Sequence, residues 1–126
     1  MKNLEFIARP ANAMSLVKRK LVLGVGINDV DYRIRYVKGR RTVKCPYYLK
    51  WHRMLLMCYC PRYAKLHPRL KRCTVVNSWL TFSVFKAWMM QQEWFNRKLS
   101  VYNTIYSPLT CEFTGTTSTG EDNENN

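Results

Sequence analysis

The stretch CPYYLKWHRMLLMCYC, residues 45–60, decides the fold that this sequence predicts. Pro46 suits the first turn of a helix, because a first-turn amide has no partner within the helix and proline has no amide hydrogen. Apolar and aromatic side chains then recur at helical spacing, at Tyr48, Trp51, Met54, Leu55 and Cys58. We therefore expect a helix that begins near Pro46, places Trp51 in the core and ends before Pro61.

A second helix is predicted after Thr81, since threonine, like Asn77 upstream, is a residue type that caps helix N-termini. The positions that follow the spacing of three and four residues are Phe82, Phe85, Trp88, Met89 and Gln92. An aromatic stripe at this spacing is typical of a helix face that packs in the core. We therefore expect this stripe to be buried.

A hairpin is predicted ahead of the first helix. Residues 32–37 alternate between aromatic or aliphatic side chains and, at Arg33 and Arg35, basic ones. This is the pattern of a strand with one apolar face and one polar face. Gly39 suits a tight turn before a second extended segment at Thr42 and Val43.

Other segments read as short strands, turns or loops. Residues 21–27 favour a short strand or an extended turn, residues 61–68 a basic loop, and residues 73–76 a short strand. Residues 105–113 suggest an extended pair around a Ser-Pro turn. The predicted fold class is α+β: a small single domain with two main helices and a few short antiparallel strands.

The composition divides the chain into three parts. Residues 1–20 mix polar, small and basic side chains without a clear period and are predicted to form an N-terminal arm. Residues 21–114 are predicted to form the basic α+β domain. Residues 115–126, GTTSTGEDNENN, contain no hydrophobic side chain, so we expect a disordered acidic tail.

The charge distribution is the main functional feature of the sequence. Between Asp31 and Glu93 stand fourteen lysines and arginines and no acidic residue, and the chain has a formal net charge of +13. Like charges at this density repel one another unless a partner or counterions neutralise them. Aromatic residues interleave with the basic ones, which suits a surface that meets both phosphates and bases. Nucleic acid is therefore the predicted partner, DNA first and RNA as an alternative.

The residues predicted to contact phosphates belong to the expected hairpin, the first helix and the following basic segment. They are Arg33, Arg35, Arg40, Arg41, Lys44, Lys50, Arg53, Arg69, Lys71 and Arg72. Each of them has an alternative interpretation as a solvated surface charge. An acidic protein or a membrane surface is the competing kind of partner for such a charge.

The apolar segments of the sequence indicate where the protein is located in the cell. No apolar run is long enough to span a bilayer, and Glu5 and Arg9 interrupt the start where a signal peptide needs apolar residues. We therefore expect a cytoplasmic protein with no membrane partner.

The five cysteines are an odd number without a secretory context, which favours reduced thiols over a disulfide framework. Cys58 and Cys60 are too close in sequence for a zinc knuckle, so no metal and no cofactor is predicted.

Three segments together resemble a known family. CPYYLKWHRMLLMCYC, HPRLKRCTVVNSWLTFSVFKAWM and IYSPLTCEF are similar to a bacteriophage family of small HNH-like, homing-endonuclease-like proteins, over residues 22–113. In that family an aromatic helix ends near Arg-Cys-Tyr, and a basic loop and a short strand follow. A Phe-x-x-Phe-x-x-Trp-Met helix and a Tyr-Ser-Pro-x-x-Cys turn come next. The resemblance implies a phage-type protein that handles nucleic acid.

The sequence departs from this family where the cleavage chemistry would lie. HNH cleavage needs a metal held by His, Asp or Asn and a general base, usually His. The family's Asp-Lys/Arg-Asp stretch is replaced here by LSVYN at residues 99–103. His52 and His67 fall on a helix and a loop rather than in a ββα metal hairpin, which leaves Asn103 and Glu112 as nearby oxygen ligands.

We therefore expect a DNA-binding protein related to HNH homing endonucleases, with no catalytic residues. Two alternatives stay open. One is an active endonuclease that uses Mg²⁺ or Zn²⁺. The other is a phage protein that binds and inhibits a host protein through the same basic face.

Overall fold

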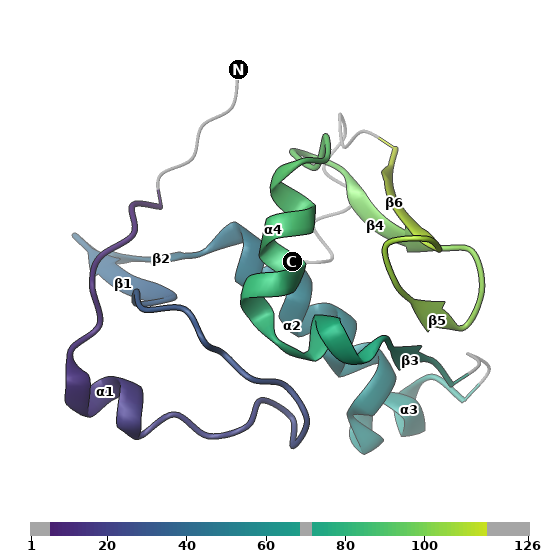
Figure 1. The fold of residues 1–126 in the computed structure, drawn as a ribbon, viewed down its shortest axis with the longest axis horizontal. Coiled ribbons are helices and arrows are strands. Elements are labelled where there is room, and N and C mark those ends of the chain that lie inside the picture. Colours follow the sequence, from purple (N-terminus) through teal and green to yellow (C-terminus); the bar gives the residue numbers. More distant parts are fainter. Residues whose placement is uncertain (1–5, 69–71, 116–126) are drawn as a thin grey trace.

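The computed structural model describes residues 6–68 and 72–115. Within these residues the helices are α1 (Ala13–Val17), α2 (Pro46–Tyr59), α3 (Pro61–Leu66) and α4 (Phe82–Met90), and the 3₁₀ helix η1 (Asn77–Leu80) precedes α4. The strands are β1 (Arg35–Lys38), β2 (Arg41–Lys44), β3 (Thr74–Val75), β4 (Lys98–Val101), β5 (Ile105–Tyr106) and β6 (Cys111–Thr114). Figure 1 shows α2 and α4 at the centre, with the β1–β2 hairpin on one side and β4, β5 and β6 on the other. The predicted α+β class with two main helices is confirmed.

The core lies between α2 and α4 and is largely aromatic. The buried side chains of the two helices are Trp51, Met54, Leu55 and Cys58 from α2 and Phe82, Phe85 and Met89 from α4. The ring of Trp51 lies 5.1 Å from that of Phe82, and its Nε1 donates a 2.7 Å hydrogen bond to the carbonyl oxygen of Trp79. This bond pairs the indole N–H, which would otherwise make the burial of tryptophan costly. The prediction that Trp51 belongs to the core is confirmed.

Residues 21–27 form a turn that packs on α2, which is one of the two predicted alternatives. The amide of Gly26 donates a 2.9 Å hydrogen bond to the carbonyl oxygen of Val22. A Cβ atom at Gly26 would lie 2.6 Å from Cδ1 of Leu55 and 2.9 Å from the ring of Trp51. Glycine therefore allows the backbone to approach the helix this closely.

The start of α4 is held by a residue from outside the helix. Thr81 is the N-cap residue, as predicted, but its side chain makes no capping hydrogen bond. The Asp29 carboxylate instead accepts hydrogen bonds from the amide of Ser83, at 2.8 Å, and from its hydroxyl. A carboxylate in this place pairs an amide that the helix itself leaves unpaired. The turn that contains Asp29 is thereby fixed against α4.

β1 and β2 form the predicted hairpin. The register pairs Arg35 with Lys44, Tyr36 with Val43, Val37 with Thr42 and Lys38 with Arg41. Gly39 in the connecting turn has a φ of +64°, a conformation that glycine adopts without steric cost. Tyr36 and Val43 are buried, whereas the basic side chains of both strands are exposed, so the predicted alternation is confirmed.

The C-terminal strands pair differently from the prediction. β3 and β5 run parallel, and β4 and β6 run antiparallel. The extended pair predicted within residues 105–113 is therefore wrong, because β5 and β6 are both strands but each pairs with another strand. β4 was not predicted; its Leu99 and Val101 stand opposite Phe113 and Cys111.

Helix α3 occupies a segment that was predicted to be a loop. Pro61 lies just after the end of α2, as predicted, and also in the first turn of α3, where its missing amide costs nothing. Arg62, Ala64, Lys65 and Leu66 are all good helix formers. The basic loop prediction is therefore wrong for this part of the segment.

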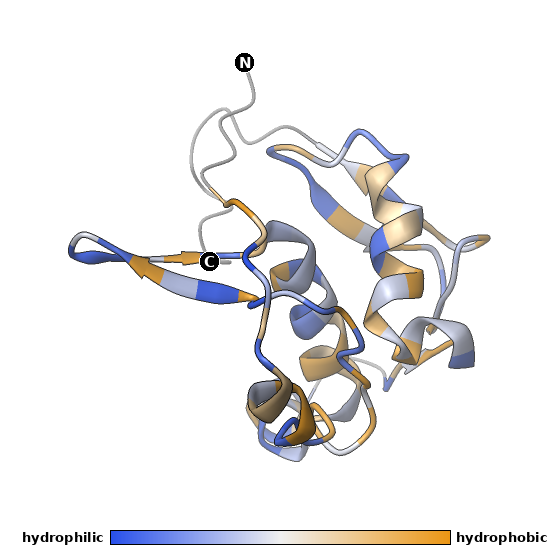
Figure 2. Ribbon diagram, turned by 60° about the vertical axis from the view of Figure 1, so that its left-hand side comes forward, coloured by the Kyte–Doolittle hydropathy of each residue, from blue (hydrophilic) through white to orange (hydrophobic). Residues whose placement is uncertain are grey.

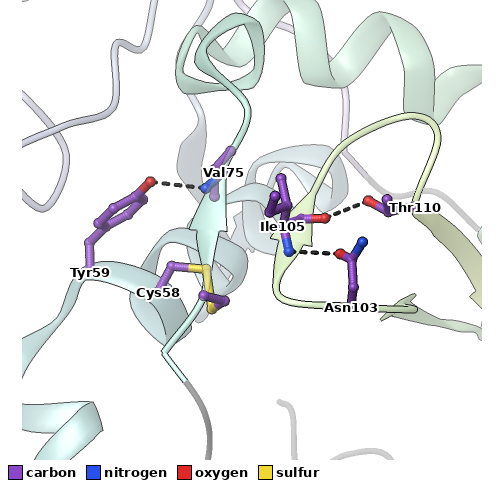
Figure 3. Close-up of a disulfide and its surroundings, with 7 residues drawn as sticks. Cys58, Tyr59, Val75, Asn103, Ile105 and Thr110 are labelled. Atoms are coloured by element: carbon purple, nitrogen blue, oxygen red, sulfur yellow. Dashed lines mark hydrogen bonds between the residues drawn. A yellow bond between two sulfur atoms is a disulfide. The ribbon is translucent and has the colours of Figure 1, made fainter.

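A disulfide joins Cys58, near the end of α2, to Cys73, just before β3 (Figure 3). Their Cα atoms are 4.8 Å apart, which is within the range that a disulfide spans. The expectation of reduced thiols is therefore wrong for this pair, while Cys45, Cys60 and Cys111 are free. The adjacent Tyr59 hydroxyl accepts a 2.9 Å hydrogen bond from the amide of Val75, so α2 holds β3 at two neighbouring points.

The segment predicted to form an N-terminal arm lies against the domain over its described part. The ring of Phe6 lies 5.7 Å from that of Tyr32 and 5.6 Å from that of Tyr36. Further along, Arg19 donates hydrogen bonds to backbone carbonyls of the domain. Between these two attachments, α1 buries none of its side chains.

Two other expectations concern the tail and the membrane. The predicted acidic tail lies outside the described residues, apart from Gly115. None of the helices in the described ranges combines the length and the apolar character that a bilayer span requires.

Candidate nucleic-acid interface

A pocket of about 600 Å³ lies between the N-terminal segment, the β1–β2 hairpin and α2. We call it the cationic pocket, because five of its lining side chains are positively charged: Arg19, Lys20, Arg33, Arg35 and Lys44. No aspartate or glutamate of residues 6–68 or 72–115 lines it. The pocket is therefore a region of positive potential without an internal counter-charge.

The extended chain leading into β1 places two arginines on the side of the pocket. Arg33 and Arg35 are exposed, while Tyr32 and Tyr36 are buried, because successive residues of an extended chain point to opposite faces. Arg35 stands directly opposite Lys44 in the hairpin register. Like charges in this position destabilise a strand pair. The pair is therefore unfavourable for the fold unless an anion lies near both charges.

The guanidinium of Arg19 is held in place by the backbone. Its Nη1 donates hydrogen bonds to the carbonyl oxygens of Asn28, at 3.0 Å, and of Val30, and its Nη2 donates to that of Tyr32 at 2.9 Å. Carbonyl oxygens carry no formal charge, so these bonds orient the guanidinium without neutralising it. Arg19 therefore contributes a positive charge whose position is set before any ligand binds.

One wall of the cationic pocket is aromatic and apolar. Tyr48 and His52, one helical turn apart on α2, stack with ring centroids 5.8 Å apart and planes 30° apart. Leu49, which is 47% exposed, lines the pocket together with Val22 and Ile34. The pocket thus combines positive charges with rings and aliphatic side chains, which suits a ligand that has both a phosphate and a base.

The positive charges act on two ionisable side chains of this wall. Burial lowers the pKa of His52 below its ordinary value, and the Lys44 ammonium lowers it further, so His52 is neutral at pH 7. Burial raises the pKa of the Tyr48 hydroxyl, and the charges of Arg19 and Arg35 oppose this rise. Both rings are therefore uncharged aromatic surfaces near neutral pH.

The lowered pKa of His52 predicts a pH-dependent free energy of unfolding. Because the unfolded chain binds a proton at this site more readily than the folded one, stability should fall once the pH drops below the ordinary value of 6.5. The fall should end where folded His52 itself becomes protonated. Urea unfolding between about pH 7.5 and about pH 5 should give a smaller loss for His52→Gln than for the wild type. An equal loss in His52→Gln and the wild type would contradict the prediction.

The structure brings together three of the residues predicted to contact phosphates. Arg33, Arg35 and Lys44 line the cationic pocket. Arg40 and Arg41 lie at the far end of the hairpin, which extends away from the helices (Figure 2). These five residues therefore belong to the pocket or to the hairpin that forms one of its sides.

Two predicted residues on α2 lie elsewhere. The Nζ of Lys50 donates a 2.9 Å hydrogen bond to the carbonyl oxygen of Arg97. Burial raises the pKa of the Tyr106 hydroxyl and the charge of Arg53 opposes this rise, which locates Arg53 near Tyr106. Among the described residues, neither Lys50 nor Arg53 belongs to the pocket lining.

The last three predicted residues precede β3. Arg72 is exposed and adjoins the disulfide-bonded Cys73, away from the described lining of the cationic pocket. Arg69 and Lys71 lie outside the described residues. Within the described residues, this predicted extension of the basic track is represented by Arg72, which does not line the pocket.

Arg19, Lys20 and His52 are among the pocket residues that were not predicted as contacts. The KRK run at residues 18–20 was a visible signal, but Asp29 and Asp31 separate it from the acid-free stretch. The Asp29 carboxylate accepts a hydrogen bond from the amide of Ser83 and does not line the pocket. The spacing of His52 from Tyr48 places the two rings on one helix face, which favours an aromatic surface over the role of a metal ligand.

The possible metal ligands are dispersed in the described part of the chain, where no three His, Cys, Asp or Glu side chains form a group that could hold a metal ion. The Asn103 side-chain oxygen accepts a 2.8 Å hydrogen bond from the amide of Ile105 and so shapes the turn before β5 (Figure 3). Glu112 is exposed on β6 and stands opposite Ser100. Neither residue belongs to the cationic pocket.

The expected position of His52 on a helix is confirmed. Helix α2 follows the β1–β2 hairpin directly, so the three elements have the order ββα and His52 lies on the helix of that unit. The residues of β1 and β2 that line the pocket with it are Arg35 and Lys44, which are cations and cannot act as metal ligands. His52 thus shares its pocket with groups that attract anions.

Comparison of the chain with protein-family models, with curated proteins and with solved structures found no match in any of the three.

Proposed function

We propose that this protein binds DNA through the cationic pocket and the adjoining hairpin, and that it does not cleave the DNA. In this proposal it is a phage-type relative of the HNH-like, homing-endonuclease-like proteins and acts in the cytoplasm of the host cell. The observation that carries the proposal is the pocket itself, with five positive side chains and no carboxylate among the described lining residues.

The arrangement of these charges supports an anionic partner. Arg35 and Lys44 face one another across the hairpin, and both line the pocket. This pair costs folding free energy, since like charges directly opposite repel one another. A phosphate chain near the hairpin would relieve this repulsion and release its own counterions.

The hairpin offers a second surface for the same partner. It extends away from the helices (Figure 2), and Arg40 lies in its turn. Basic side chains on such a ribbon fit phosphate contacts, which position a protein on nucleic acid without reading its sequence. The pocket and the hairpin together would follow several consecutive phosphates.

The absence of cleavage is proposed from the chemistry of the site. Metal-dependent cleavage needs carboxylate, amide or imidazole ligands around a divalent cation. On the described ββα unit, His52 is the side chain that could supply an imidazole ligand. It lines the pocket together with five cationic side chains. These charges would repel a divalent metal ion from the place where an HNH centre needs it.

A plasmid assay with a gel-shift control tests both parts of the proposal. Supercoiled plasmid at about 50 mM salt should be retarded by micromolar protein, as expected for contacts that are mainly to phosphates. It should stay supercoiled with magnesium, manganese or zinc. Nicking that depends on a metal would refute the absence of cleavage. If neither the plasmid nor a single strand of DNA is retarded at this salt, DNA binding is refuted.

A further inference from the structure

We propose that the cationic pocket receives a nucleotide of single-stranded DNA, with its phosphates on the basic side chains and its base on the aromatic wall. The protein would then prefer single strands to paired duplex. This inference rests on the proposed DNA binding and adds the form of nucleic acid that the pocket accepts.

The mixed lining of the pocket is the first reason. A site for phosphate alone needs only charges and hydrogen-bond donors. Here the charges of Arg33, Arg35 and Lys44 lie beside the half-exposed apolar surface of Leu49 and the stacked rings of Tyr48 and His52. A nucleotide matches both halves of this lining, since it carries an anionic phosphate and a flat, weakly polar base.

The concave form of the pocket is the second reason. Its volume of about 600 Å³ falls within the range of pockets that bind small molecules. Duplex DNA is read by elements that protrude into its grooves, and its bases are stacked inside the helix. A base reaches a recess only from a single strand or after it leaves the stack, which costs free energy. The unpaired strand therefore enters the pocket more favourably.

The aromatic wall is the third reason. His52 and Tyr48 are stacked with centroids 5.8 Å apart, and a base packed against them would extend that stack. His52 is neutral at pH 7, because burial and the Lys44 charge both disfavour its protonated form. Stacking on such rings accepts any base, so the expected preference is for strandedness and not for sequence.

Competition binding measures the preference directly. A labelled single strand is bound to the protein and displaced either by the same strand unlabelled or by a blunt duplex with G·C pairs at both ends. We expect the single strand to compete about tenfold better per nucleotide. Charge alone predicts the reverse order, because duplex DNA has the higher charge density.

Variants at the two histidines separate stacking from folding effects. His52→Ala should lower the ratio of single-strand to duplex competition to about one or below, and His52→Phe should restore it, since phenylalanine keeps a ring at this position. The ring of His67 lies tilted by 32° against that of Tyr63, with centroids 4.3 Å apart, and this pair is not part of the described pocket lining. His67→Ala is therefore the matched control and should keep the wild-type ratio.

The outcomes distinguish this inference from the proposed function. Equal competition by both forms, or stronger competition by the duplex, would overturn the inference and leave DNA binding intact. An unchanged ratio in His52→Ala would also overturn it. Failure of both forms to bind would refute the proposed function together with the inference.

Discussion

Exchanging Arg35 and Lys44 together for glutamate is expected to weaken DNA binding by at least about 100-fold. Each replacement removes a charge-assisted contact with phosphate and adds a repulsive carboxylate to the cationic pocket. The fold should survive, because one like-charged cross-strand pair replaces another in the same register. Fluorescence anisotropy with a labelled single strand gives the two dissociation constants, and circular dichroism checks that the variant is folded.

The matched control moves the same change in net charge to another part of the surface. Arg62 and Lys65 are exposed on α3 and do not belong to the described lining of the pocket. Replacing both with glutamate should weaken binding by less than about tenfold, because only long-range, screened attraction is lost. Equal losses in the two double variants would mean that overall charge, and not the cationic pocket, determines binding.

Replacing Trp51 with alanine is expected to lower the free energy of unfolding by about 4 kcal/mol or more. The side chain is fully buried and packs against the ring of Phe82. Its removal leaves a large cavity and deprives the carbonyl oxygen of Trp79 of its hydrogen bond. Small domains have a total stability of about 5–15 kcal/mol, so this loss is a large part of the whole. Urea unfolding followed by far-UV circular dichroism measures it without relying on tryptophan fluorescence.

Leu49 provides the control for this variant on the same helix. Its side chain is 47% exposed, so Leu49→Ala should cost less than about 1 kcal/mol. A similar loss of stability in the two variants would contradict the placement of Trp51 at the centre of the core.

The main helices and the hairpin were predictable because their signals are local. The apolar spacing along α2 and α4 identifies the faces that become buried, and Pro46 and Pro61 mark the bounds of α2. The alternation around β1 and the glycine at position 39 identify the hairpin. Each of these features depends on residues only a few positions apart.

The strand pairings and the disulfide were not predictable in the same way. β5 pairs with β3 across about thirty residues, and nothing in either short strand specifies that partner. Cys58 and Cys73 meet because α2 and β3 pack together, and the cysteine count alone pointed to reduced thiols. Helix α3 was missed because its basic, Pro-bounded sequence also fits a loop.

The positive charge of the pocket was predictable from the sequence, but the full set of its lining residues was not. The acid-free stretch identified Arg33, Arg35 and Lys44, whose side chains the hairpin brings to one pocket. Lys50 directly follows the pocket residue Leu49, but consecutive side chains on a helix point about 100° apart. The Nζ of Lys50 therefore points elsewhere and donates a hydrogen bond to the carbonyl oxygen of Arg97. Arg19 belongs to an earlier segment of the chain, and hydrogen bonds to backbone carbonyl oxygens hold it at the pocket. No local sequence pattern indicates these contacts.

The salt dependence of single-strand affinity tests the central claim most directly. If the cationic pocket and its hairpin neutralise about three to five phosphates, log affinity should fall linearly with log salt, with a slope of about −2 to −3.5. Between about 50 and about 200 mM salt the affinity should drop by about 15- to 130-fold. An affinity that stays constant across this range would contradict the claim that these basic side chains bind a phosphate chain.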